Sequence, residues 1–134
     1  MEDITCTIIK PGATEKWKEI FTLIETEGFT IIRSDQVQLT KQQAEEFYSE
    51  HKGKPFFESL VKFMSSKPIV VAVLQKENAV EDFRTFIGDI NPAKAKVGTL
   101  RKLYGTTIEQ NAIHGSNSNK NAERESKFLF PKSM

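Results

Sequence analysis

Runs of apolar residues predict four β-strands along the chain. Residues 69–74 are apolar without a break, which is typical of a central strand buried on both faces. A β-rich run over 5–10 predicts the first strand, and a short apolar piece around Ile113 predicts the last. The strand predicted over 29–39 has a polar middle at 33–36, which favours a bulge or a place at the edge of the sheet.

Apolar residues repeated every three or four positions predict helices between these strands. The first helix is expected to follow an N-cap at Thr14 and to end at Gly28. Thr40 and Gln43 fit a capping box, in which two side chains satisfy free backbone N–H groups, so we expect a helix over 41–51. The remaining helices are predicted over 56–65, 78–88 and 119–128.

The order of these elements indicates one α+β domain over 1–134. The strands are few, and two successive helices separate the second strand from the third, which disfavours a doubly wound parallel sheet. The order fits a ferredoxin-like βαββαβ sandwich, a four-stranded antiparallel sheet with its helices on one face. Between 90 and 107 no periodicity is visible, so we expect a long loop, which in a compact domain is usually functional or disordered.

Composition narrows the class of protein further. The 134 residues are 38% apolar and 28% charged with a formal net charge of +1, as in a soluble globular domain without general attraction to nucleic acid or membrane. No apolar stretch approaches the length of a transmembrane span, and the acidic start Met-Glu-Asp is unlike a signal peptide. We therefore expect a cytoplasmic protein with no membrane partner and no specific nucleic-acid partner. The single cysteine, Cys6, lies in an apolar run and is expected to be a buried structural thiol.

The loop carries a cluster of cations, Lys94, Lys96, Arg101 and Lys102, with no acidic residue between them. Such a segment suits phosphate, because Arg in particular donates two parallel hydrogen bonds to this kind of anion. A solvated surface loop would carry the same charges without any ligand, and this interpretation stays open. The chain has neither a P-loop nor a GxGxxG fingerprint, so a nucleotide would have to be held in another way.

A histidine, His114, follows a short apolar pair and precedes a run of small polar residues. Imidazole titrates near neutrality and can act as a nucleophile, although a single histidine of this kind is also common as a hydrogen-bonded structural residue. With only one other histidine, His51, the chain cannot form a His-rich metal site. Glu125 lies on the following predicted helix, and a carboxylate bonded to one ring nitrogen would leave the other free to attack. The sequence does not distinguish the two nitrogens.

Three other residues have two interpretations each. Lys10 ends the first strand at a turn, where its charge either reaches into a cleft or remains solvated. Tyr48 is either part of the core or an aromatic residue at the rim of a site. Phe56 either packs at the start of its helix or offers a flat surface on which a base stacks.

Five segments of the chain resemble the nucleoside diphosphate kinase family. They are Ile-Ile-Lys-Pro at 8–11, Lys-Pro-Phe-Phe at 54–57, Asn-Pro-Ala at 91–93, Gly-Thr-Leu-Arg at 98–101 and Asn-Ala-Ile-His-Gly-Ser at 111–116. The similarity covers nearly the whole chain, and the order and spacing of the segments are specific to that family. The resemblance implies the ferredoxin-like fold with a long phosphate-binding loop.

Through this resemblance we expect an enzyme that transfers the γ-phosphate of a nucleoside triphosphate, typically ATP, to a nucleoside diphosphate through a phosphohistidine, with ping-pong kinetics. The catalytic residues would be His114, Glu125, Tyr48 and Ser116, and the nucleotide-binding residues would be Lys10, Phe56, Arg84, Ile90, Arg101 and Asn111. Mg²⁺ would be held chiefly by the phosphates and water, without protein ligands. The chain would form a homo-oligomer, either a hexamer or a tetramer built from dimers.

Some positions differ from the usual family pattern. Ile90 stands where a threonine near the phosphates is common, and Asn117 replaces a common aspartate, which removes a negative charge near the metal. Lys67 stands in place of a frequent glycine, and both the segment over 12–16 and the C-terminal tail are short. These differences leave a catalytically weak nucleotide-binding or interaction member of the family as an alternative. An unrelated RNA-binding module is disfavoured, because Phe29 is the only clear aromatic residue on the predicted strands.

Overall fold

The computed structural model describes residues 3–131 and contains a four-stranded antiparallel sheet in the order β2-β3-β1-β4. The strands are β1 (Asp3–Ile9), β2 (Thr30–Val37), β3 (Ile69–Lys76) and β4 (Ile113–Gly115). Because β3 lies between β2 and β1, the prediction of a central strand from its apolar run is confirmed. The predicted edge position of the second strand is confirmed too, since β2 is an outer strand, and its register shifts between Ile31 and Arg33, just before the polar middle.

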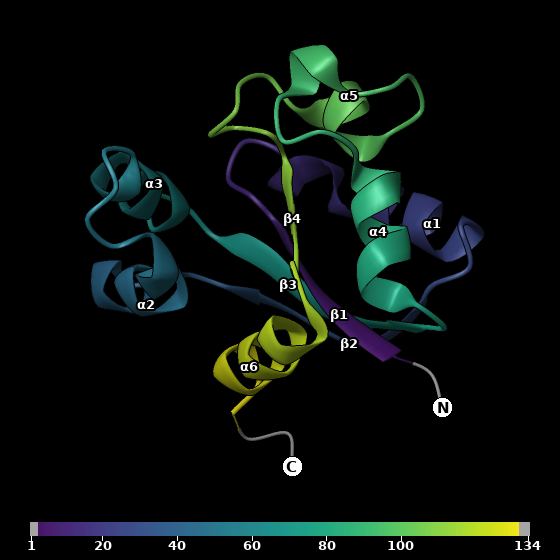
Figure 1. Cartoon of the computed structure of the whole chain (residues 1–134), viewed down its shortest axis with the longest axis horizontal. Coiled ribbons are helices and arrows are strands. Elements are labelled where there is room, and N and C mark those ends of the chain that lie inside the picture. The colour runs from purple at the N-terminus through teal and green to yellow at the C-terminus, as the bar shows by residue number, and fades with distance from the viewer. Residues whose placement is uncertain (1–2, 132–134) are drawn as a thin grey trace.

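Helices cover both faces of this sheet (Figure 1). They are α1 (Trp17–Thr26), α2 (Lys41–Phe47), α3 (Phe57–Met64), α4 (Ala79–Ile87), α5 (Leu100–Tyr104) and α6 (Asn119–Leu129). α1 and α4 lie on one face, and α2, α3 and α6 lie on the other. The expectation of helices on a single face was wrong. The side chains of β3 are apolar on both faces of the sheet, so helices have to cover each face. Among residues 3–131, none of these helices is long and apolar enough to cross a membrane.

Two apolar clusters, one on each face of the sheet, form the core. Ile9 and Phe83 belong to the cluster under α1 and α4, whereas Ile8 and Phe47 belong to the cluster under α2, α3 and α6. The adjacent residues Ile8 and Ile9 therefore point to opposite faces, as alternate residues of a strand do. Cys6 is fully buried, as predicted, and burial raises the pKa of its thiol to about 12, which makes it unreactive at neutral pH.

The first helix begins later than the sequence predicts. Thr14 lies in a short 3₁₀ helix that precedes α1, and it does not act as an N-cap. Its hydroxyl group instead donates to the carbonyl oxygens of Lys10 and Pro68, at 3.2 Å each. The segment between the first strand and α1 is thereby tied to the turn that precedes β3.

The second predicted helix is also shorter than expected. The capping box of Thr40 and Gln43 is present, which confirms the predicted start. However, α2 ends at Phe47, and a 3₁₀ helix (Ser49–His51) forms the rest of the segment. The change of helix type turns the chain toward α3 and brings His51 beside Phe56, with their ring centroids 5.3 Å apart.

The segment expected to be an irregular loop contains regular structure. It holds a 3₁₀ helix (Pro92–Lys94) and α5, which Thr99 caps. The prediction over 90–107 was therefore wrong in part, because a helix of five residues is too short for an apolar period to show in the sequence. Leu100 anchors α5 in the core and leaves the next residue, Arg101, near the end of α4.

Candidate active site

A cavity of about 630 Å³, within the usual size of small-molecule sites, lies beside β4 on the face covered by α2, α3 and α6. All of the predicted site residues except Ser116 line it, namely His114, Glu125, Tyr48, Lys10, Phe56, Arg84, Ile90, Arg101 and Asn111. They come from β4, from the three helices α4, α5 and α6, and from the segments between elements. The fold thus brings together residues from both ends of the chain.

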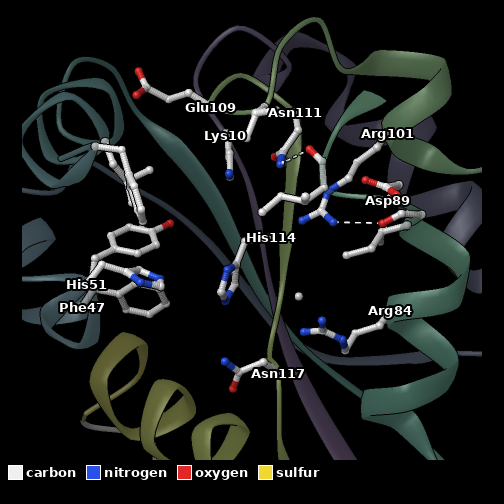
Figure 2. Close-up of a pocket in the computed structure, with 18 of the residues that line it drawn as sticks. Lys10, Phe47, His51, Arg84, Asp89, Arg101, Glu109, Asn111, His114 and Asn117 are labelled. Atoms are coloured by element: carbon white, nitrogen blue, oxygen red, sulfur yellow. Dashed lines mark hydrogen bonds between the residues drawn. The ribbon is translucent and has the colours of Figure 1, made fainter. Parts of the chain in front are cut away.

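His114 occupies the middle of this cavity (Figure 2). It lies opposite Ile8 in the pairing of β4 with β1, so its side chain points toward α2 and α6. Its ring centroid is 5.4 Å from that of Phe47 and 6.3 Å from that of Tyr48, both in edge-on arrangements. The ring nitrogen Nε2 lies 2.9 Å from Oε1 of Glu125. Within residues 3–131 no hydrogen bond reaches the other ring nitrogen, Nδ1.

Glu125 positions the imidazole from α6. Its Oε1 accepts a second hydrogen bond of 2.7 Å from the hydroxyl of Ser116, which in turn accepts one of 3.0 Å from the backbone N–H of Cys6. Burial alone would raise the pKa of Glu125, but the hydrogen bond and charge of His114, the hydrogen bond from Ser116 and the charge of Arg124 lower it overall. The carboxylate is therefore ionised at neutral pH, and the hydrogen atom shared with it belongs to Nε2 of His114.

Three cationic side chains from distant parts of the chain, Lys10, Arg84 and Arg101, lie around the same cavity (Figure 2). Burial, together with the charge of Arg101, lowers the pKa of Lys10 to about 7, against a smaller opposing effect of Glu109. Burial and the charge of Arg84 likewise lower the pKa of Arg101 to about 10. Cations that burial and mutual repulsion destabilise in this way favour the binding of an anion.

Backbone carbonyl groups orient two of the polar residues. The guanidinium nitrogens Nη1 and Nη2 of Arg101 donate to the carbonyl oxygens of Gly88 and Ile113, each at 3.0 Å. The amide nitrogen of Asn111 donates to the carbonyl oxygen of Ile90 at 3.0 Å. Its amide oxygen is buried and has no partner in the part of the chain that the structure describes, so it is available to a ligand.

Comparison with known proteins identifies the family. The family model described as nucleoside diphosphate kinase matches residues 3–134. The chain belongs to the nucleoside diphosphate kinase family. A nucleoside diphosphate kinase from Histophilus somni (strain 2336) is 50% identical over 128 residues, which cover 94% of this chain and 91% of that protein.

Solved structures of nucleoside diphosphate kinases share the fold. The enzyme from Aquifex aeolicus has a TM-score of 0.90 and 38% identity, covering 97% of this chain and 96% of its own. The halophilic enzyme from Halobacterium salinarum, in complex with CDP, has a TM-score of 0.92 and 30% identity, covering 97% of this chain and 88% of its own. These matches confirm the predicted ferredoxin-like α+β fold and a phosphotransferase of the nucleoside diphosphate kinase type, and they favour it over the catalytically weak alternative.

In this member of the nucleoside diphosphate kinase family, aromatic residues lie at one side of the cavity. Phe56 is 46% exposed and lines the cavity, so its ring is accessible there. The ring of His51 packs beside the ring of Phe56, and the Lys54 ammonium lies 5.9 Å from the centroid of the Phe56 ring. Tyr48 is buried, and its hydroxyl group has no hydrogen-bond partner within residues 3–131.

The cations of the loop do not act together. Only Arg101 lines the cavity, whereas Lys94, Lys96 and Lys102 are exposed, as the solvated interpretation expected. The sequence also left several lining residues unassigned to the site, namely Glu50, His51, Asp89, Ile108 and Glu109. Each of them is of a type that is common in turns or on surfaces. Only the fold, which places it in space beside residues distant in the sequence, assigns it to the site.

Proposed function

We propose that Nδ1 of His114 takes the γ-phosphate from a nucleoside triphosphate and passes it to a nucleoside diphosphate. The hydrogen bond of 2.9 Å between Nε2 and the ionised Glu125 carries this proposal. Because that bond requires the hydrogen atom on Nε2, the lone pair of Nδ1 is free, and the side chain that bears it lines the cavity.

The transfer runs through two similar steps. In the first, the lone pair of Nδ1 forms the P–N bond while the bond between the γ-phosphorus and the bridging oxygen breaks, and the nucleoside diphosphate leaves with that oxygen. In the second, a terminal phosphate oxygen of another nucleoside diphosphate attacks the phosphorus, and the P–N bond breaks. The imidazole gains positive charge as Nδ1 attacks, and the carboxylate of Glu125 stabilises that charge across Nε2.

The cations would hold the phosphates in line with His114. Lys10, Arg84 and Arg101 supply positive charge, and phosphoryl transfer depends on such positioning more than on covalent machinery. The buried hydroxyl of Tyr48 can donate to a phosphate oxygen, and the free amide oxygen of Asn111 can accept from a ribose hydroxyl. Both groups would gain in a nucleotide the partners that they lack in the described part of the protein.

The nucleobase would stack on Phe56, which is exposed at the cavity with the apolar Ile108. Ile90 also lines the cavity, but its side chain has no polar atom, and so only its backbone can bond a phosphate or a sugar. Stacking of this kind accepts any base, so broad use of nucleotides is the expected starting point.

We further propose that Mg²⁺ arrives with the nucleotide. Residues 3–131 contain no group of three His, Cys, Asp or Glu side chains that could hold a metal ion, whereas isolated oxygen-bearing side chains, Asp89 and Asn117, line the cavity. This lining fits an ion held by phosphates and water, with the two side chains in reach of that water. The bound ion would neutralise part of the phosphate charge.

Assembly and location are further parts of the proposal. β2 leaves an outer edge of the sheet with the apolar Ile32 45% exposed, which supports a homo-oligomer, either a hexamer or a tetramer built from dimers. The expected location is the cytoplasm, where nucleoside triphosphates are made and used.

Labelling with γ-³²P-ATP and Mg²⁺ tests the role of His114. The wild-type protein should acquire a label that is stable to base and labile to acid, and His114→Ala should acquire none. His51→Ala is the matched control, because it removes the only other histidine and should still acquire the label. A wild-type protein that takes no label, or a labelled His114→Ala variant, would contradict the proposal.

A further inference from the structure

One carboxylate, that of Glu109, lies beside the proposed base-stacking surface. Glu109 follows Ile108 in the segment before β4, and its Oε1 accepts a hydrogen bond of 3.0 Å from the hydroxyl of Ser59 on α3. Ser59 lies three residues after Phe56, within the first turn of α3. This bond therefore holds the carboxylate against α3, at the side of the cavity that Phe56 also lines. In Figure 2, the carboxylate of Glu109 points away from Lys10, toward α3.

The two oxygens of this carboxylate are in different situations. Oε1 is oriented by Ser59, whereas Oε2 has no hydrogen-bond or ion-pair partner within residues 3–131. A carboxylate accepts hydrogen bonds through both oxygens and donates none. Oε2 is therefore an oriented, negatively charged acceptor at the end of the cavity where the base would lie.

We propose that Glu109 selects bases by accepting a hydrogen bond from an amino group on the base edge. This inference rests on the proposed function, in which the base stacks on Phe56. Cytosine and adenine each offer an amino group, N4 and N6, at the same place on the base edge. Uracil, thymine, guanine and hypoxanthine offer a carbonyl oxygen at the corresponding position, and this oxygen repels a carboxylate. The substrates favoured are therefore cytosine and adenine nucleotides.

The other charged groups near this end of the cavity already have partners. The Lys54 ammonium, which lies over the Phe56 ring, donates to Nδ1 of His51 at 3.2 Å. One oxygen of Glu50 lies 3.9 Å from Nε2 of His51. Glu109 is thus the charged residue here with an oriented atom left for a ligand.

The charge of Glu109 also acts on Lys10, whose pKa it raises slightly against the larger effect of burial. This offers a competing role, in which Glu109 tunes the phosphate site and treats all bases alike. The two roles differ in a measurable way. Base selection changes the ratio between nucleotides, whereas an effect through Lys10 changes the rates for all nucleotides together.

The test uses pairs of acceptors that differ in one amino group. The phosphoenzyme is prepared with labelled ATP, freed of nucleotide and mixed with limiting CDP or UDP, and separately with ADP or IDP, and the second-order rate of label loss is measured. CDP should react about five- to tenfold faster than UDP, and ADP than IDP by a similar factor, as expected for a charged hydrogen bond at a partly exposed site. Both pairs keep the ring size constant, so the area of stacked ring does not contribute to the ratios.

Variants assign the effect to this carboxylate. Glu109→Leu should bring both ratios close to one, and Glu109→Gln, with a neutral oxygen, should leave intermediate ratios. Glu45→Leu, an exposed residue of α2 outside the cavity, is the matched control and should keep the wild-type ratios.

Several results would overturn the inference. They are wild-type ratios near one, ratios that Glu109→Leu leaves unchanged, and a uniform rate loss in Glu109→Leu with constant ratios, which would indicate action on Lys10. If the wild-type phosphoenzyme did not form at all, the proposed function would fail and this inference with it. If it formed and reacted equally with all acceptors, only the inference about Glu109 would fail.

Discussion

Replacing Glu125 by Gln tests how much the carboxylate contributes to phosphoryl transfer. The variant keeps the shape of the side chain but replaces a charged acceptor by a neutral one. In the wild-type protein one oxygen accepts from both His114 Nε2, at 2.9 Å, and Ser116, at 2.7 Å, in a side chain that is 3% exposed. Burial on this scale keeps water from replacing the lost interaction.

The magnitude follows from the kind of hydrogen bond that is lost. A hydrogen bond to a charged group contributes about 1.5–3 kcal/mol, and a neutral one about 1 kcal/mol. The difference of about 0.5–2 kcal/mol applies to the step in which His114 becomes positive, so Glu125→Gln should slow phosphoenzyme formation about two- to thirtyfold. The effect should appear in the rate at saturating ATP, because Glu125 supports the nucleophile and does not bind the nucleotide.

Rapid-quench measurement of label incorporation gives this rate directly. Glu123→Gln is the matched control, because Glu123 lies two positions before Glu125 on the same helix but is exposed and pairs with Lys127 at 3.2 Å. This control should react within twofold of the wild-type rate. If Glu125→Gln were phosphorylated as fast as the wild-type protein while keeping its melting temperature, the proposed role of the carboxylate would be refuted.

Two further predictions concern proton binding and backbone strain. Because the pKa of Lys10 is about 7 in the free protein and a bound triphosphate would raise it, ATP binding near pH 8 should take up close to one proton. Calorimetry in two buffers of different ionisation enthalpy measures this proton uptake, which should vanish in Lys10→Met. If the wild-type protein took up no proton on binding ATP, the lowered pKa of Lys10 would be contradicted. Gly88→Ala should destabilise the protein by roughly 2–3 kcal/mol in urea unfolding, since Gly88 has φ of +91° and a Cβ would lie 2.6 Å from Thr99 Oγ1. Gly12→Ala is the control for backbone strain alone, because Gly12 has φ of +90° and a Cβ there would meet nothing within 4 Å. It should lower the free energy of unfolding less than Gly88→Ala does, and an equal loss in both variants would exclude the clash with Thr99 as a cause.

The sequence predicted the elements that follow from local patterns. The apolar run of β3 and the capping box of Thr40 and Gln43 are present as expected, because a neighbouring residue or a short repeat determines each of them. The N-cap at Thr14 was wrong, because its hydroxyl found acceptors at Lys10 and Pro68, and the second of these lies 54 positions away. The prediction failed because a local sequence pattern contains no information about such a tertiary contact.

The part of the site around His114 was predicted more completely than the part where the base would lie. Resemblance of motifs indicated the residues around His114, and the contact with Glu125 is present, while the roles of these residues stay predictions. At the base end, the stacking role of Phe56 stays a prediction, whereas the contact between Ser59 and Glu109 was missed, since these residues are 50 positions apart and neither stands in a recognisable pattern. The choice between the two imidazole nitrogens also needed the fold, because only the position of α6 shows which nitrogen the carboxylate holds.

The nitrogen that carries the phosphate is the most direct measure of the proposed mechanism. NMR of the phosphoenzyme prepared with ¹⁵N-labelled histidine detects the coupling between phosphorus and one ring nitrogen of His114. Phosphorus coupled to Nδ1, with the hydrogen atom retained on Nε2, is the expected result, because Glu125 holds Nε2 at 2.9 Å. Phosphorus on Nε2 would contradict the mechanism, because it would require the hydrogen bond with Glu125 to be broken before the attack.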